Sequence, residues 1–130
     1  MVDMKLWIDD VRSAPEGYAW CRSVNEAKAL IEKCNKSLED LAARVKELDA
    51  IGDHEEADHL HMVAVSAYIN IVDIDHDAGE YAYDGGDYIK LLDWLEETGR
   101  NYPIRIHSMN PVGVENMRRI IQKNGWTEVR

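Results

Sequence analysis

Acidic side chains suited to a divalent cation stand at the ends of two apolar stretches. Asp9 and Asp10 follow the apolar part of KLWIDDVR, and Asp75 lies at the end of INIVDIDHDAG. Mg²⁺ and Mn²⁺ prefer carboxylate oxygens, and a bound cation relieves the repulsion between neighbouring carboxylates. The sequence therefore predicts a Mg²⁺ or Mn²⁺ site formed by these three residues. The alternative is a set of solvated acids that cap helices or turns.

Two histidines occupy similar places in the sequence. His76 follows Asp75, and His107 follows the apolar part of PIRIHSMN. Because the pKa of histidine lies near neutrality, one imidazole can take a proton from water while the other gives one to a leaving oxygen. We expect His76 and His107 to act as acid and base, with Asp75 as a catalytic residue that orients them or binds the cation. The alternative role is structural hydrogen bonding.

A further group of possible ligands lies at residues 54 to 61. His54, Asp58 and His61 are spaced by four and three residues, which places them on one face of a helix. Zinc sites use such spacing, but this segment is highly charged and contains no cysteine. The pattern favours a solvated helix face.

The strands that would position these residues form an α/β fold. Residues 69–74 are nearly continuous in β-branched side chains, as in a strand covered on both faces. Further strands are predicted at residues 4–9, 18–22, within 103–110, and at 126–130. With helices between them, this order predicts a three-layer, flavodoxin-like fold with a five-stranded parallel sheet in the order 2-1-3-4-5. Ligands bind such sheets at the carboxyl ends of the strands, where the polar residues gather.

Capping signals mark the predicted helices. Ser23 and Glu26 form a capping box, and Asn110 precedes Pro111 at the start of the last helix. Gly99 and Gly125 are placed to end helices.

Residues 36–68 are predicted to form an inserted αα-hairpin within a single domain of residues 1–130. Leu38, Leu41, Val45 and Leu48 repeat at helical spacing, and Gly52 breaks the pattern before a second helix. Such a hairpin would cover the ligand pocket or form a homodimer through its apolar stripe.

The composition excludes several classes of partner. The formal net charge of -10 argues against charge-driven binding to duplex nucleic acid. The sequence has no signal-peptide pattern and no apolar stretch of membrane-spanning length, so we expect a cytoplasmic protein without a membrane partner. Cys21 and Cys34 are expected as small apolar residues without a disulfide.

The chain resembles the receiver-like domains of the cyclic-phosphate processing family, which are relatives of response-regulator receivers. The matching segments are LWIDDVR (6–12), SVNEAKALI (23–31), DHDAG (75–79), GGDYIKLLDWL (85–95) and IHSMNPVGVENMRRII (106–121). The resemblance implies a receiver-like fold and a role on phosphate esters, such as RNA ends with a 2′,3′-cyclic phosphate or cyclic nucleotides. The sequence departs from the family in its long 36–68 segment. It also lacks the Lys-Pro that ordinary receivers carry after their last strand, which argues against phosphoacceptor signalling through Asp75.

Three more residues are candidates for phosphate binding. Ser108 is expected to contact a phosphate oxygen in preference to acting as a nucleophile, and Arg12 could bind phosphate or pair with Glu16. Asn110 is expected to cap the last helix, whose amides would favour an anion. Together these residues predict a small phosphoesterase that acts on cyclic phosphates, or alternatively a module that binds or sequesters a nucleotide without catalysis.

Overall fold

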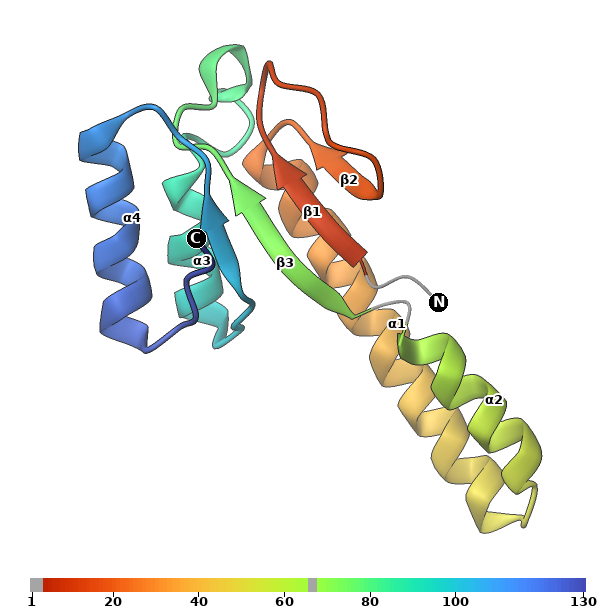
Figure 1. Cartoon of the computed structure of the whole chain (residues 1–130). Coiled ribbons are helices and arrows are strands. Elements are labelled where there is room, and N and C mark those ends of the chain that lie inside the picture. Colours follow the sequence, from red (N-terminus) through yellow and green to blue (C-terminus); the bar gives the residue numbers. More distant parts are fainter. Residues whose placement is uncertain (1–3, 66–67) are drawn as a thin grey trace.

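The computed structural model describes residues 4–65 and 68–130, which alternate between strands and helices (Figure 1). The elements are β1 (Met4–Ile8), β2 (Tyr18–Cys21), α1 (Val24–Ala50), α2 (His54–Val65), β3 (Ile69–Ile74), a 3₁₀ turn (Gly79–Tyr81), α3 (Ile89–Thr98), β4 (Ile104–Ile106) and α4 (Pro111–Asn124). The predicted α/β class is confirmed.

The described strands form one parallel sheet in the order β2-β1-β3-β4. The predicted fifth strand at 126–130 is wrong, since this segment makes a single parallel bridge between Glu128 and Ile104. The Ile104 amide donates to the Thr127 carbonyl, and the Ile104 carbonyl accepts from the Val129 amide. A side-chain contact also holds the bridge residue, because Arg118 pairs with the Glu128 carboxylate at 2.9 Å.

The sheet is covered by helices on one face, so the predicted three-layer arrangement is also wrong. Apolar side chains on alternate strand positions, such as Leu6, Val72 and Ile104, share one core with α1, α3 and α4. Figure 1 shows α1 and α3 behind the sheet. The connection between β1 and β2 is the loop at 9–17, which contains no helix. Because crossovers between parallel strands are right-handed, a helix in that connection would have covered the other face.

The predicted helix caps are present. The Ser23 hydroxyl accepts from the Glu26 amide at the start of α1, and the Asn110 side chain accepts from the Gly113 amide at the start of α4. Gly99 and Gly125 end α3 and α4 in the left-handed conformation. The Asn110 cap fixes where α4 begins, which positions the residues between β4 and α4.

Helix α1 is continuous over 27 residues, so the first arm of the expected hairpin is an extension of α1 and not a separate helix. No glycine or proline lies between Ser23 and Gly52 to interrupt it. Within the described ranges, no helix has both the length and the apolar character needed to cross a membrane.

Candidate functional site

Strand register brings three of the predicted site residues together, namely Asp9, Asp75 and His107. Trp7, Asp73 and Arg105 form one row across β1, β3 and β4. Side chains alternate between faces along a strand, so the residues two positions further on, Asp9, Asp75 and His107, project on the same side at the sheet edge. Each of these three offers one ligand atom, and the three atoms lie within 4.8 Å of one another.

His107 is held between two buried carboxylates. Its Nε2 lies 2.8 Å from Asp9 Oδ2, and its Nδ1 lies 2.6 Å from Asp73 Oδ1. The imidazole stacks on the Trp7 ring, with centroids 3.9 Å apart, and its side chain is 7% exposed. Both nitrogens face carboxylate oxygens, an arrangement that suits the imidazolium form of His107, which has two N–H donors.

The pKa shifts of this pair agree with the contacts. Burial lowers the pKa of His107, but hydrogen bonds to Asp73 and Asp9 outweigh it, and the net shift raises the pKa. Burial raises the pKa of Asp9, but the backbone amides of Arg12 and Val11, together with His107, hold it below its ordinary value. The charged forms of both groups are therefore favoured.

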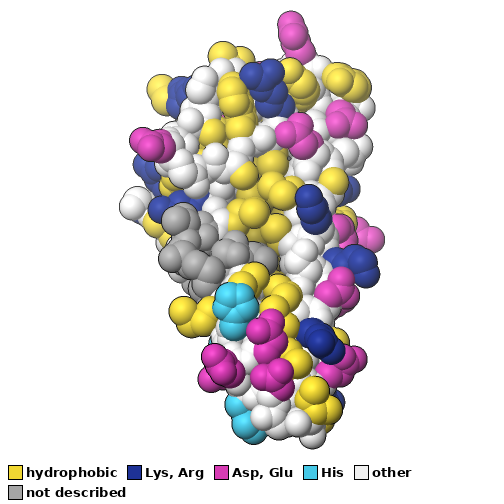
Figure 2. Space-filling view, turned by 90° about the vertical axis from the view of Figure 1, so that its right-hand side faces the viewer, with side chains coloured by type: hydrophobic (Ala, Val, Ile, Leu, Met, Phe, Trp, Pro, Cys, Tyr) yellow, Lys and Arg dark blue, Asp and Glu magenta, His cyan; other side chains and the backbone are white. Residues whose placement is uncertain are grey.

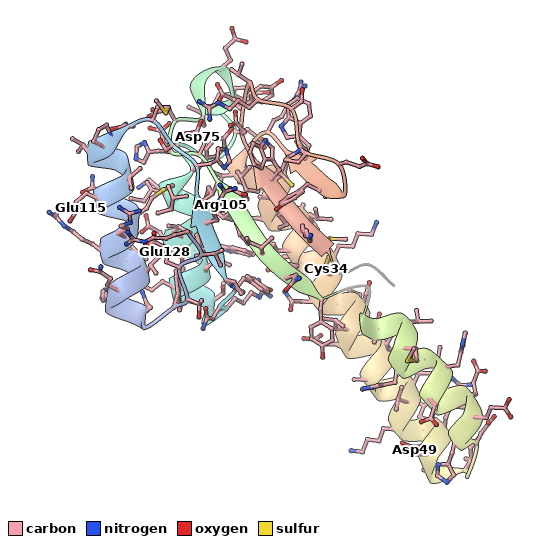
Figure 3. The ribbon with its side chains drawn as sticks, in the orientation of Figure 1. Cys34, Asp49, Asp75, Arg105, Glu115 and Glu128 are labelled. Carbon is pink, nitrogen blue, oxygen red and sulfur yellow. The ribbon has the colours of Figure 1, made fainter. Side chains whose placement is uncertain are left out.

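Asp73 is a site residue that the sequence analysis missed. It is fully buried, and its second oxygen accepts from Arg105 Nη1 at 3.1 Å. Figure 3 shows Arg105 on β4 beside β3, and Asp75 beyond the end of β3. An acid between Val72 and Ile74 in a largely apolar strand was the available signal, because a buried carboxylate requires a partner.

Asp10 and Asp75 complete the acidic side of the site. Partial burial, with repulsion from Asp9 and Asp75, raises the pKa of Asp10. One oxygen of Asp75 accepts from the adjacent His76 amide at 2.7 Å. The loop after β3 passes so close that a Cβ at Gly79 would clash with the Asp10 carboxylate. This crowding of carboxylates favours a cation.

His76 lies in a different environment from His107. Its Nδ1 is 2.9 Å from Asp77 Oδ1, and its ring packs against α4 at Gly113, where a Cβ would clash with it. The side-chain nitrogen Nδ2 of Asn110 lies 3.4 Å from the same Nδ1. No residue in the described ranges hydrogen-bonds to Nε2. The side chain is 14% exposed, and no described contact joins it to His107.

Of the three predicted phosphate ligands, Ser108 and Asn110 are held by local contacts, and Arg12 contacts the end of β4. The Ser108 hydroxyl accepts from the Asn110 amide at 3.1 Å, and Asn110 caps α4. The exposed Arg12 side chain reaches the His107 carbonyl at 3.4 Å. Arg12 therefore lies beside the acidic cluster, while Ser108 and Asn110 shape the turn into α4.

The other histidine group does not converge. His54 pairs with Asp49 at the exposed tip of the hairpin, 3.0 Å apart. Over residues 4–65 and 68–130, Asp9, Asp75 and His107 are the one group of three or more such side chains close enough to share a metal ion.

A family model described as the cyclic-phosphate processing receiver domain matches residues 4–123 of the chain. No curated protein and no solved structure gives a significant match. The match extends across the sheet, the hairpin and the loops that carry the clustered residues.

Proposed function

The chain belongs to the family of cyclic-phosphate processing receiver domains, and we propose that it is a phosphoesterase that opens a cyclic phosphate at the carboxyl edge of its sheet. The observation that carries this proposal is the convergence of Asp9, Asp75 and His107 within 4.8 Å. The substrates that we propose are RNA ends with a 2′,3′-cyclic phosphate and cyclic nucleotides.

The donor set fits a divalent cation. Two carboxylates and one imidazole suit Mn²⁺ better than Mg²⁺, which prefers oxygen ligands. Asp9, Asp75 and His107 Nε2 would hold the ion, which would take the place of the proton on Nε2, and Asp10 lies close enough to add to the negative potential. Asp73 accepts from His107 Nδ1, the arrangement that orients a ligating histidine in many metal sites. When bound, the cation would neutralise the phosphate oxygens.

We assign proton transfer to His76. Hydrolysis of a cyclic phosphate forms a bond from a water oxygen to phosphorus and breaks one ester bond to phosphorus. With Nδ1–H donated to Asp77, His76 Nε2 can take the proton from the attacking water and return it to the leaving oxygen. Arg12, beside the cluster, supplies a positive charge for a phosphate oxygen. This division of roles replaces the expected His76–His107 acid–base pair.

The test is release of phosphomonoester from 2′,3′-cyclic mononucleotides and from RNA with cyclic ends, in Mn²⁺ and in EDTA. We expect turnover that depends on Mn²⁺ and is lost in Asp75→Asn. Absence of turnover on all these substrates would contradict the proposal, as would unchanged rates in both Asp75→Asn and His76→Gln.

A second candidate function is nucleotide binding without catalysis. One observation favours it: both nitrogens of His107 are hydrogen-bonded to carboxylates, so His76 is the single histidine available for proton transfer at this edge of the described sheet. The pair of histidines expected for acid–base catalysis is therefore incomplete. Calorimetry that detects tight binding of a cyclic nucleotide, with no product formed, would establish this function instead.

A further inference from the structure

Most arginines of the described ranges pair with a carboxylate, as expected in a chain with 25 acidic and 15 basic residues. The paired ones are Arg44, Arg100, Arg105, Arg118, Arg119 and Arg130. No described carboxylate pairs with Arg12 or Arg22. Both lie at the carboxyl edge of the sheet, since Arg12 contacts the His107 carbonyl after β4 and Arg22 directly follows β2. Guanidinium groups without a carboxylate partner in so acidic a chain are available to an external anion.

Aromatic side chains hold Arg22 in place. Its guanidinium carbon lies 4.1 Å from the centre of the Trp20 ring and 5.9 Å from that of the Tyr81 ring. Its Nη1 donates to the Tyr81 hydroxyl at 3.2 Å, and no described residue accepts a hydrogen bond from its other N–H groups. The side chain is therefore oriented and still free to donate. Such a group loses less conformational entropy on binding an anion than a flexible one does.

Two contacts place this aromatic pair beside the acidic cluster. The Trp20 indole donates to the Asp9 carbonyl at 2.8 Å. Tyr81 lies in the 3₁₀ turn that begins at Gly79, and Gly79 packs against the Asp10 carboxylate. The guanidinium between the two rings therefore lies on the β2 side of the residues that would hold the cation.

The loop that carries Tyr81 is itself anchored to the start of α1. The Ser23 hydroxyl donates to one oxygen of Asp84 at 2.6 Å, and the Asn25 side chain donates to the other at 3.1 Å. A Cβ at Gly85 would clash with α1, so the loop lies directly against this helix. These contacts fix the position of Tyr81 and occupy both oxygens of the Asp84 carboxylate.

The helical hairpin, in contrast, does not suit an anion. Residues 36–65 contain more than twice as many acidic as basic residues. Figure 2 shows acidic side chains and histidines on this hairpin, in the lower part of the view. An anionic substrate is therefore expected to lie across the carboxyl edge, between Arg12 and Arg22, and not along the hairpin.

We propose that Arg22 forms a second phosphate-binding site, which takes the 5′ phosphate of the nucleotide whose cyclic phosphate lies at the acidic cluster. Arg12 keeps its place at the cyclic phosphate. This inference rests on the proposed function and narrows its substrate. The preferred ligand has a phosphate on each side of the terminal ribose, as an RNA end does and as a cyclic mononucleotide does not.

Calorimetry of the full chain in Mn²⁺ with two stable ligands tests the site. Adenosine 3′-phosphate and adenosine 3′,5′-bisphosphate are opened forms of the substrate that differ only in the 5′ phosphate. In the wild type, this phosphate should tighten binding at least roughly tenfold, the effect of one charge-assisted contact. Arg22→Gln should abolish the difference and leave the affinity for adenosine 3′-phosphate unchanged.

Arg44→Gln is the matched control, because it removes the same charge from the hairpin, away from the carboxyl edge (Figure 1). It should leave both affinities unchanged, and circular dichroism verifies that each variant folds. Equal affinity of the wild type for the two ligands, or no binding of either, would overturn the second site. A preference for the bisphosphate that persists in Arg22→Gln would also overturn it.

A third ligand identifies the source of the 5′ phosphate. A diadenosine nucleotide with a 3′-phosphate presents it as a diester, and it should bind at least as tightly as the bisphosphate. A preference for the bisphosphate alone would support the site and assign it to 5′-phosphorylated mononucleotides. Because none of these ligands is turned over, an absence of phosphoesterase activity would contradict the proposed function without deciding the role of Arg22.

Tyr81→Phe tests whether the orientation of Arg22 contributes. The substitution removes the hydroxyl that accepts from Arg22 and keeps both the ring and the positive charge. We expect the preference for the bisphosphate to fall by about threefold, with the affinity for adenosine 3′-phosphate unchanged. An unchanged preference would show that Arg22 acts by its charge alone and would overturn the positioning role of Tyr81.

Discussion

The ends of β3 and β4 each present a histidine, but their surroundings give the two residues different capacities. At the end of β4, both nitrogens of His107 meet buried carboxylates from two other strands. At the end of β3, His76 is held on one side by Asp77, its neighbour in the sequence, and by packing on Gly113. The comparison shows that a strand-end position brings a histidine to the site, while strand register and adjacent residues determine whether it can exchange a proton with a ligand.

The largest expected difference between the two is in stability. His107→Ala would remove the cation shared by Asp9 and Asp73, which are 1% and 0% exposed; Asp73 would keep its pairing with Arg105, and Asp9 would lose its basic partner. Removing one partner of a buried ion pair costs about 3–5 kcal/mol, since the remaining charge is uncompensated. Urea denaturation should show a loss of this size in the free energy of unfolding.

His54→Ala provides a matched control for this prediction. His54 also pairs with an aspartate, but both side chains are more than half exposed, at 71% and 53%. Exposed pairs contribute little, so this variant should unfold at the wild-type urea concentration. An equally small loss for His107→Ala would mean that groups other than His107 stabilise the negative charges of the buried carboxylates.

The next effect is on catalysis and is specific to His76. His76→Gln should lower the rate of cyclic-phosphate hydrolysis by about 10² to 10⁴-fold, the usual contribution of a general base. Since His76 makes no contact with a fully buried charge, the urea midpoint should stay close to that of the wild type. A variant that loses stability but keeps its rate would reverse the roles that we assign to the two histidines.

A substitution on α4 tests the position of the His76 ring without changing the imidazole. A Cβ at Gly113 would clash with that ring, so Gly113→Ala should displace it from its place beside Asp77. We expect roughly a tenfold loss of rate, because misplacement of a reacting group is costly even when the group is retained. Val114→Ala, one residue further along α4, is the control; a normal rate in Gly113→Ala would show that ring position is unimportant.

The sequence was sufficient to predict the four parallel strands that the structure describes, the caps of α1 and α4, and the meeting of Asp9, Asp75 and His107 at one edge. These features depend on local patterns and on the rule that parallel strands share their carboxyl ends. The open face of the sheet and the single bridge at Glu128 could not be predicted as easily, since they depend on how the chain crosses between strands. The role of Asp73 depends on register with Trp7 and Arg105, which no single segment encodes.

The smallest expected effect is a dependence of stability on pH that belongs to one histidine. The pKa of His107 is raised in the folded state, so its contribution is complete below the unfolded value of about 6.5 and is lost as the pH rises through the folded pKa. The lowered pKa of Asp9 has the opposite sign: its contribution is complete above about 3.9 and is lost as the pH falls through the folded value. In EDTA, stability to urea should therefore be greatest between about pH 4 and about 6.5 and should decline at alkaline pH. His76→Gln should keep the alkaline decline, whereas His107→Ala should reduce it. A decline of equal size in both variants would assign the titration to another group, and the distinction between the two histidines would then rest on the kinetic measurements alone.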